Sequence, residues 1–336
     1  MHPLRSLCVF VLVCVCAAVR AQVPALHGAG ATFPMPLYRQ WADDYARAGG
    51  AALDYAAVGS AAGIARIRAR AVDFGASDAP LDADTLAREG LLQFPAAIGA
   101  VVPVVNLAGV RPDALRLTGE VLAGIYAGRV RRWDDAAIAA LNPELRLPRA
   151  NITVVHRLDA SGTTLLFTTY LAGKDAGFAL GVGAGLERSW PVGVGGVGND
   201  GVAALVQRTR QSIGYVEYAY AIERRLARAQ LRNRDGAFVS ANVDAFEAAI
   251  GDWRGGDLAA QLPVDRAGSA AWPLVGASFI LVSRSRERAA STRAAIDFFA
   301  WSLREESGAT RALGYVAMPE VALRHVEDSL DEAPPH

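Results

Sequence analysis

The sequence predicts an α/β fold of two lobes joined by strands that cross between them. Short apolar runs alternate with patterns of helical period, and the 336 residues are enough for two domains of ordinary size. No low-complexity linker separates two halves, as expected if strands rather than a flexible segment connect the lobes. The composition, 52% hydrophobic and 20% charged, is that of a globular protein with a core.

Strands and helices are expected to alternate from the first quarter of the chain onward. Apolar runs predict strands over Leu53–Val58, Ala71–Gly75, Ile98–Val105, Ile152–Val155 and Ser278–Val282. One-face spacing predicts helices around Leu37, Trp41 and Tyr45, over Ala62–Arg70, and over Thr163–Leu171.

Two of the apolar runs are candidates for the crossings between lobes. They lie near Gly99–Asn106 and Gly276–Val282. If both cross, one lobe is discontinuous and built from both ends of the chain. We expect residues 22–101 together with 276–336 to form lobe I, and residues 102–275 to form lobe II.

Residues 1–21 have the pattern of a secretory signal peptide. Arg5 provides the charged start, an apolar stretch runs from Leu7 to Val19, and Val19-Arg20-Ala21 fits a cleavage site. The apolar stretch is too short for a membrane anchor. All three cysteines lie in this segment: Cys8, Cys14 and Cys16. The mature chain would therefore hold no disulfide or thiol ligand. A lipoprotein modified at Cys14 or Cys16 is a less favoured alternative, because neither cysteine follows a small residue.

The segment from Arg157 to Thr163 combines groups that can bind an anion. Ser161 stands where a helix N-cap is expected, and a helix start offers free N–H groups and the positive end of the dipole. Gly162 allows a ligand to approach the backbone, while Arg157 adds a bidentate donor. The alternative is a helix cap with no ligand.

Two further helix starts in the first quarter carry hydroxyl groups. Thr32 and the N–H of Phe33 precede the helix that follows Pro34. Ser60 lies between a predicted strand and a predicted helix, where we expect it to be the N-cap. Each is by itself a common structural turn, and the glycine-rich segment before Thr32 lacks the Lys-Ser/Thr of a P-loop.

Asp78 follows a predicted strand end, the place where open α/β sheets bind ligands. One interpretation is an Asx-turn. The other is discrimination between anions, because a carboxylate repels a bare anion and accepts only from a ligand that carries a proton. Phosphate carries a proton near neutral pH and sulfate does not. An unpaired buried acceptor costs about 1–3 kcal/mol, so the residue would disfavour the wrong oxyanion.

The sequence predicts neither catalysis nor a metal or cofactor. The five histidines form no pair with metal-ligand spacing, and no Gly-x-Ser-x-Gly surrounds Ser161. A net charge of zero argues against a nucleic-acid binder that depends on a basic surface.

With these features in place, the chain resembles the periplasmic phosphate-binding proteins of Pst-type ABC transporters. The similar stretches span Gly28 to Ala221 and continue near Trp272 and Ser278: GAGATFPMPLYRQWADDY, VGSAAG, VDFGASDAPL, RRWDDAAIAALNPELRLP, HRLDASGTTLLFTTYL, VGGVGNDGVAALVQ, IGYVEYAYA, WPL and SFILV. The resemblance implies the type II periplasmic binding protein fold, with two hinge-crossing strands. It also implies a periplasmic location, and partners that are inorganic phosphate and the permease and ATPase subunits of a phosphate importer.

The resemblance also implies the ligand contacts. The first lobe would contribute Thr32, Phe33, Ser60 and Asp78, and the second lobe Arg157, Ser161, Gly162 and Thr163. Asp159 would hold the fork of Arg157 in place. Two departures are Ala61, where many relatives have a serine, and Ala160, where they have a glycine.

Three other functions are alternatives to phosphate binding. Sulfate or molybdate binding is disfavoured by Asp78, and phosphate-ester hydrolysis with Ser161 or Thr163 as nucleophile by the lack of an identifiable base. A surface protein that has kept the fold for signalling or adhesion is the third.

Overall fold

A computed structural model describes residues 24–251, 264–304, 309–320, 323–324 and 327. The predicted signal peptide, with its three cysteines, lies outside the described residues. Within the described part of the chain, no helix is both long and apolar enough to cross a bilayer.

A nine-stranded mixed sheet forms the centre of the molecule. Its strands follow the order β2-β1-β3-β12-β4-β8-β6-β7, and β9 also pairs with β4. Their bounds are β1 Leu26–Gly30, β2 Leu53–Ala57, β3 Phe74–Ser77, β4 Leu91–Asn106, β6 Thr153–Arg157, β7 Val194–Gly196, β8 Ser212–Glu217, β9 Ala227–Arg228 and β12 Val275–Ser283. A smaller sheet has the order β11-β10-β5, with β5 Arg116–Leu117, β10 Gln230–Arg232 and β11 Phe238–Val239.

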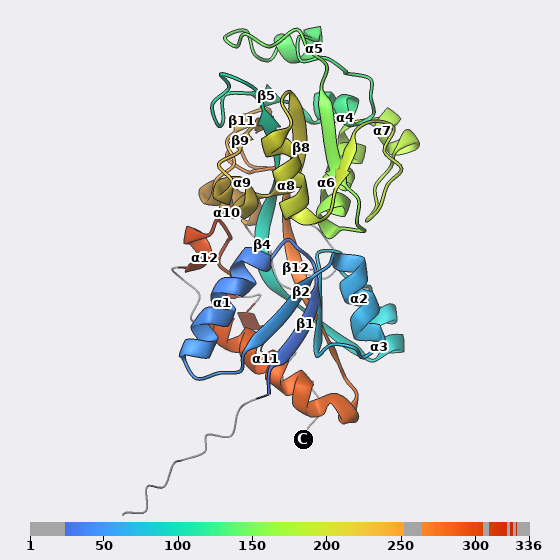
Figure 1. Cartoon of the computed structure of the whole chain (residues 1–336), viewed down its shortest axis with the longest axis vertical. Helices are drawn as coiled ribbons and strands as arrows, with labels where there is room; N and C mark the ends of the chain where they lie inside the picture. The colour runs from blue at the N-terminus through green and yellow to red at the C-terminus, as the bar shows by residue number, and fades with distance from the viewer. Residues whose placement is uncertain (1–23, 252–263, 305–308, 321–322, 325–326, 328–336) are drawn as a thin grey trace, which may run out of the picture.

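The long strands β4 and β12 run between two groups of elements (Figure 1). The first part of β4, Leu91–Ala100, pairs with β12, and its second part, Val101–Asn106, pairs with β8. A bulge between Ser278 and Phe279 interrupts the pairing of β12 with β4. One strand therefore serves two parts of the sheet, and no flexible linker is needed.

The first group surrounds β1, β2 and β3, which are parallel to one another where they pair. Helices α1 and α11 cover one face, where Phe299 contacts Tyr38, Trp41 and Phe74 edge to face. Helices α2 and α3 lie on the other side (Figure 1). The bounds are α1 Met35–Arg47, α2 Ser60–Arg68, α3 Ala83–Glu89, η2 Arg286–Arg288 and α11 Ala289–Arg304.

The second group contains β5 to β11 and helices α4 to α10 (Figure 1). Strands β6, β7 and β8 are parallel where they pair, and α8 packs on them. The bounds are α4 Gly119–Tyr126, α5 Ala136–Ala139, α6 Gly162–Lys174, α7 Ala176–Gly181, α8 Gly198–Arg208, α9 Tyr218–Glu223 and α10 Val243–Ile250. Near the C-terminus, α12 (Ala309–Ala312) lies beside this group, where Arg311 pairs with Asp244 and Glu247 of α10.

Most of the predicted elements are confirmed, with shifted ends. The helices around Trp41 and over Thr163–Leu171 are α1 and α6, and the predicted strand at Ile98–Val105 is the central part of the much longer β4. The predicted strand at Ala71–Gly75 is wrong in its bounds, because β3 begins only at Phe74 and ends at Ser77. The preceding residues form a turn in which Arg70 adopts a positive φ.

Helix α2 approaches β1 and β3 through a glycine. A Cβ at Gly63 would lie 2.5 Å from the Cα of Gly30 and 2.6 Å from the carbonyl oxygen of Ala76. Both are backbone atoms, which cannot move aside as a flexible side chain can. Gly63 therefore sets how closely α2, which starts at Ser60, lies against the sheet.

Gly63→Ala should lower the free energy of unfolding by about 1–3 kcal/mol, because the added methyl group forces α2 away from the sheet. Urea denaturation of the variant and the wild type measures the difference.

Gly173→Ala is the matched control. Gly173 lies in α6, and a Cβ there would meet nothing within 4 Å. Alanine at this position should leave stability unchanged or raise it by up to about 1 kcal/mol. Equal stabilities for the two variants would contradict the close approach of α2.

Candidate functional site

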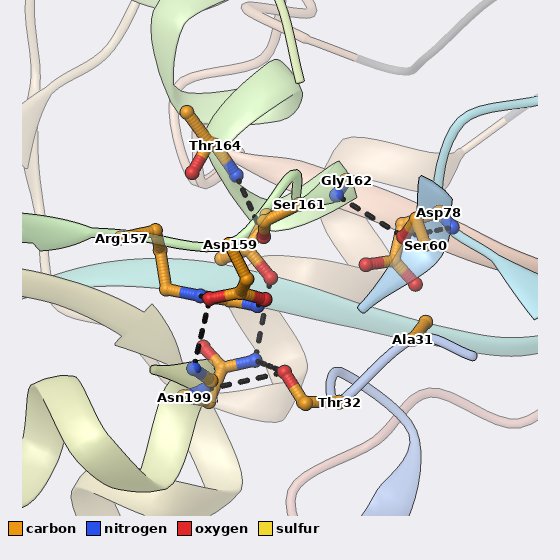
Figure 2. Close-up of polar contacts among 12 residues, drawn as sticks. Ala31, Thr32, Ser60, Asp78, Arg157, Asp159, Ser161, Gly162, Thr164 and Asn199 are labelled. Carbon is orange, nitrogen blue, oxygen red and sulfur yellow. Dashed lines mark hydrogen bonds and ion pairs between the residues drawn. The ribbon is translucent and has the colours of Figure 1, made fainter. Parts of the chain in front are cut away.

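The candidate site lies where the carboxyl ends of two sets of parallel strands face each other. The loops after β1, β2 and β3 belong to the first group of elements, and those after β6 and β7 to the second. Loops at the carboxyl ends of parallel strands are the usual ligand sites of α/β sheets. Figure 2 shows the labelled side chains gathered around the start of α6.

The loop between β1 and α1 presents Thr32 and Phe33. Two buried tyrosines fix its backbone: the Tyr220 hydroxyl donates to the Thr32 carbonyl oxygen at 2.6 Å, and the Tyr315 hydroxyl donates to that of Phe33 at 2.7 Å. These carbonyls are thereby satisfied. The loop can direct its N–H groups and the Thr32 hydroxyl elsewhere.

Ser60 is buried at the site, but the prediction that it caps α2 is wrong. The N-cap is Gly59, whose φ of 97° favours glycine, and Ser60 is the first residue of the helix. The Ser60 Oγ instead accepts from the N–H of Asp78 at 3.2 Å and from the N–H of Gly162 at 3.1 Å. This hydroxyl therefore connects the first group of elements to α6.

Asp78 stands directly after β3 with one carboxylate oxygen unpaired. Ser77 forms the local turn instead, because its Oγ accepts from the Ala79 N–H at 3.0 Å. The Oδ1 of Asp78 is buried without a hydrogen-bond partner in the described structure. Gly162 packs so closely that a Cβ there would lie 2.3 Å from the Cβ of Asp78. The Asx-turn interpretation is therefore wrong, and the carboxylate is directed at the start of α6.

The surroundings of Asp78 favour its protonated form. Burial raises the pKa of the Asp78 carboxyl to about 7, against the opposing effects of Ser278, Arg157 and Ser60. The group thus changes charge near neutral pH.

Asp159 holds Arg157 in a fixed orientation. The Arg157 Nε donates to Asp159 Oδ1 at 2.7 Å, and Nη2 donates to Oδ2. The Gly198 N–H also donates to Asp159 Oδ1, at 2.9 Å. Burial raises the pKa of Asp159, but its bonds to Arg157 and Gly198 outweigh this and hold the pKa below the usual range. Asp159 is therefore a carboxylate that neutralises and aims the guanidinium.

The remaining nitrogen of Arg157 has no partner. The Arg157 side chain is 1% exposed, and its Nη1 is buried with no hydrogen bond in the described structure. Such a group is costly unless something else accepts its protons.

The start of α6 supplies backbone and hydroxyl groups. Ser161 is the N-cap, as predicted, and its Oγ accepts from the Thr164 N–H at 3.3 Å. The Gly162 N–H is bound to Ser60, and no described hydrogen bond uses the Thr163 N–H. In an α-helix this first-turn N–H has no intrahelical acceptor. Ser161 and Thr163 are each 1% exposed, so the site is closed to solvent here.

Asn199, which the sequence analysis did not single out, also lies in the site. It is fully buried at the start of α8, and its Nδ2 donates to the Oγ1 of Thr32 at 2.9 Å (Figure 2). The same Nδ2 donates to the Oγ1 of Thr163 at 3.3 Å. The sequence does contain a signal for a helix start here. Gly198-Asn199 follows a short glycine-rich run, and the similar pair Gly59-Ser60 follows a predicted strand.

The structure thus brings together the nine residues named from the sequence, with Asn199 in addition. Hydroxyls, helix N–H groups and one guanidinium provide donors, and Asp78 provides a single acceptor. Among the described residues, no group of three or more His, Cys, Asp or Glu side chains could hold a metal ion. The arrangement suits an anion that both accepts many hydrogen bonds and donates one.

Comparison with known sequences agrees with this chemistry. The PBP superfamily domain matches residues 17–306. The phosphate-binding protein PstS of Xylella fastidiosa (strain 9a5c) is 44% identical over 304 residues, which cover 90% of this chain and 84% of that protein. PstS of Pasteurella multocida (strain Pm70) is 43% identical over 312 residues, covering 92% of this chain and 91% of that protein.

Solved structures share the fold. A phosphate-binding protein from Stenotrophomonas maltophilia aligns with a TM-score of 0.69 at 20% identity, covering 90% of this chain and 93% of that one. A high-affinity periplasmic phosphate-binding protein, PfluDING, solved with bound phosphate, aligns with a TM-score of 0.71 at 21% identity and the same coverage.

Asp78→Asn should change how stability depends on pH in phosphate-free protein. The pKa of Asp78 is about 7 in the folded chain against an ordinary 3.8, so between these values the folded state keeps a proton that the unfolded chain releases. The wild type therefore loses stability as pH rises through this window, by about 4 kcal/mol at most, and the variant lacks this loss. Urea denaturation from about pH 4 to about pH 8 should show the variant gaining stability relative to the wild type.

Asp82→Asn gives a control of opposite sign. Asp82 caps α3, and the Thr85 N–H and hydroxyl lower its pKa, so the wild type gains this contribution as pH rises. The Asp82→Asn variant should lose stability relative to the wild type as pH rises from the acid range. If stability changed with pH in the same way in Asp78→Asn and in the wild type between about pH 4 and about pH 7, burial would not raise the pKa of Asp78.

Proposed function

The chain belongs to the PstS family of phosphate-binding proteins within the PBP superfamily, and we propose that it binds inorganic phosphate and delivers it to an ABC transporter for import. The protein acts by binding and carries out no chemical step.

One observation supports phosphate above other anions: the closed site contains both an unpaired donor and an unpaired acceptor. The Arg157 Nη1 and the Asp78 Oδ1 are each buried without a partner in the described structure. A phosphate ion that keeps one proton satisfies both, because an oxygen accepts from Arg157 while the P–OH donates to the Asp78 carboxylate. Sulfate and molybdate carry no such proton near neutral pH, which would leave the carboxylate oxygen facing a bare anion.

The other named residues complete the coordination. Thr32, Phe33 and Ser60 would contact phosphate from the first group of elements. Ser161, Gly162 and Thr163 would do so from the second. In this arrangement α6 directs its dipole and first-turn N–H groups at the anion. Ala160, where many relatives have a glycine, leaves these groups in place, since Ser161 still caps the helix.

We further propose that the two groups of elements are lobes that open and close on the ligand. Their bounds would be 22–101 with 276–336 for lobe I and 102–275 for lobe II. The pair β4 and β12, which a bulge interrupts, would then be the hinge. Periplasmic binding proteins are known to close by such hinges. Closure would account for the burial of Ser60, Asp78 and Arg157.

The predicted signal peptide in residues 1–21 supports export, and the proposed site of action is the periplasm. The partners that such a carrier needs are the permease and ATPase subunits of a phosphate importer. Both proposals rest on the family and on the sequence pattern of the first residues.

Isothermal titration of the purified mature chain at about pH 8 should show one phosphate bound per protein. At this pH Asp78 lies above its pKa of about 7 and is a carboxylate. Arsenate, which also keeps a proton, should bind, and sulfate should bind at least about 100-fold more weakly than phosphate.

Arg157→Ala is the control that assigns the binding to this site. Removing the Arg157 guanidinium, whose Nη1 has no partner in the described structure, should abolish measurable binding of phosphate and arsenate alike. Equal binding of sulfate and phosphate by the wild type, or binding of neither, would contradict the proposed function. Hydrolysis of a chromogenic phosphate ester would contradict the assignment as a binding protein.

A further inference from the structure

Asn199 uses every hydrogen-bonding group of its side chain within the closed site. Its Oδ1 accepts from the Glu217 N–H at 2.9 Å, and its Nδ2 donates to Thr32 and Thr163. The backbone N–H can only donate, so the amide oxygen must face Glu217. The orientation of the amide is therefore determined, and the NH2 group must face the two hydroxyls.

This orientation fixes the direction of the Thr32 hydroxyl. A hydroxyl has two acceptor sites and one proton. The Thr32 Oγ1 accepts from both the backbone N–H of Asn199, at 3.2 Å, and its Nδ2, at 2.9 Å. Both acceptor sites are occupied, so the hydroxyl can only donate its proton. The Thr163 Oγ1 accepts from the same Nδ2 at 3.3 Å, which occupies one of its two acceptor sites.

The contact also joins the two groups of elements. Thr32 follows β1 in the first group, whereas Asn199 begins α8 and Thr163 belongs to α6 in the second. In addition, Gly198 packs on Thr32, because a Cβ at Gly198 would lie 3.2 Å from the Thr32 methyl carbon. The Asn199 bonds to Thr32 can therefore form only when the two groups are together.

We infer that Asn199 is a positioning residue for the proposed phosphate site, which fixes the Thr32 hydroxyl as a donor toward the anion, occupies one acceptor site of the Thr163 hydroxyl, and holds the two lobes closed over the anion. The inference rests on the proposed function. It assigns to Asn199 no direct contact with phosphate. Because its bonds form on closure, their loss acts mainly on the rate of phosphate release.

Asn199→Ala tests the inference, with Asn142→Ala as the matched control. Asn142 is also a buried asparagine, and its amide bonds to Arg116 and Ile138 lie away from the site. Titration with inorganic phosphate should show that Asn199→Ala lowers affinity at least about 10-fold, while Asn142→Ala stays within about twofold of the wild type. Chase of bound radiolabelled phosphate should show that faster release accounts for most of the loss.

A double-mutant cycle with Thr32→Val separates positioning from a structural role. If Asn199 acts through the Thr32 hydroxyl, Asn199→Ala costs clearly less affinity in the Thr32→Val background than in the wild type. Additive losses overturn the positioning role. So does an Asn199→Ala variant that binds phosphate within about twofold of the wild type.

Asn199→Asp keeps the test open if Asn199→Ala does not fold. The aspartate keeps the shape and the acceptor for the Glu217 N–H, but its second oxygen accepts the Thr32 and Thr163 protons instead of donating to those hydroxyls. Its affinity should also fall at least about 10-fold, and wild-type affinity overturns the inference. Absence of phosphate binding by the wild type overturns the proposed function, and this inference with it. Phosphate binding by the wild type with unchanged affinity in the Asn199 variants overturns this inference alone.

Discussion

The site is built around one electrostatic constraint: a buried guanidinium nitrogen and a buried carboxylate oxygen that are left unpaired together. Arg157 donates from two of its nitrogens to Asp159, which leaves Nη1 without a partner, and Oδ1 of Asp78 also has none in the described structure. Each group alone is unfavourable in a closed interior. A ligand that accepts from one and donates to the other removes both costs at once, and a protonated oxyanion is the simplest ligand that can do so.

The fold supplies the proximity that this constraint needs. Asp78 follows β3 and Arg157 ends β6, and these strands belong to parallel sets whose carboxyl ends face each other. The long strands β4 and β12 run through both sets and fix their relation without a linker. Ser60 bound to Gly162, and Thr32 bound to Asn199, then connect the two sides by hydroxyl groups. The same bonds that join the two sides thus lie at the site and orient its polar groups.

Much of the site follows from sequence because helix starts and strand ends have local signals. The place of Ser161 before an apolar helix predicts a cap, and Ser161 is the N-cap of α6. Ser60 was misassigned because the serine of a Gly-Ser pair favours the cap position, whereas a positive φ gives that position to Gly59. Asn199 was missed because its role depends on Thr32 and Thr163, which are distant in sequence and meet it only through the tertiary fold.

The selection of phosphate by the Asp78 carboxylate is tested most directly by the ratio of phosphate to sulfate affinity in Asp78→Asn, measured by titration calorimetry at about pH 8. An asparagine amide can donate to a bare oxyanion, so it removes the penalty that the Asp78 carboxylate imposes on sulfate. The preference for phosphate should therefore fall at least about 10-fold in the variant. An unchanged ratio would show that the Asp78 carboxylate does not select phosphate through the proton that the ligand carries.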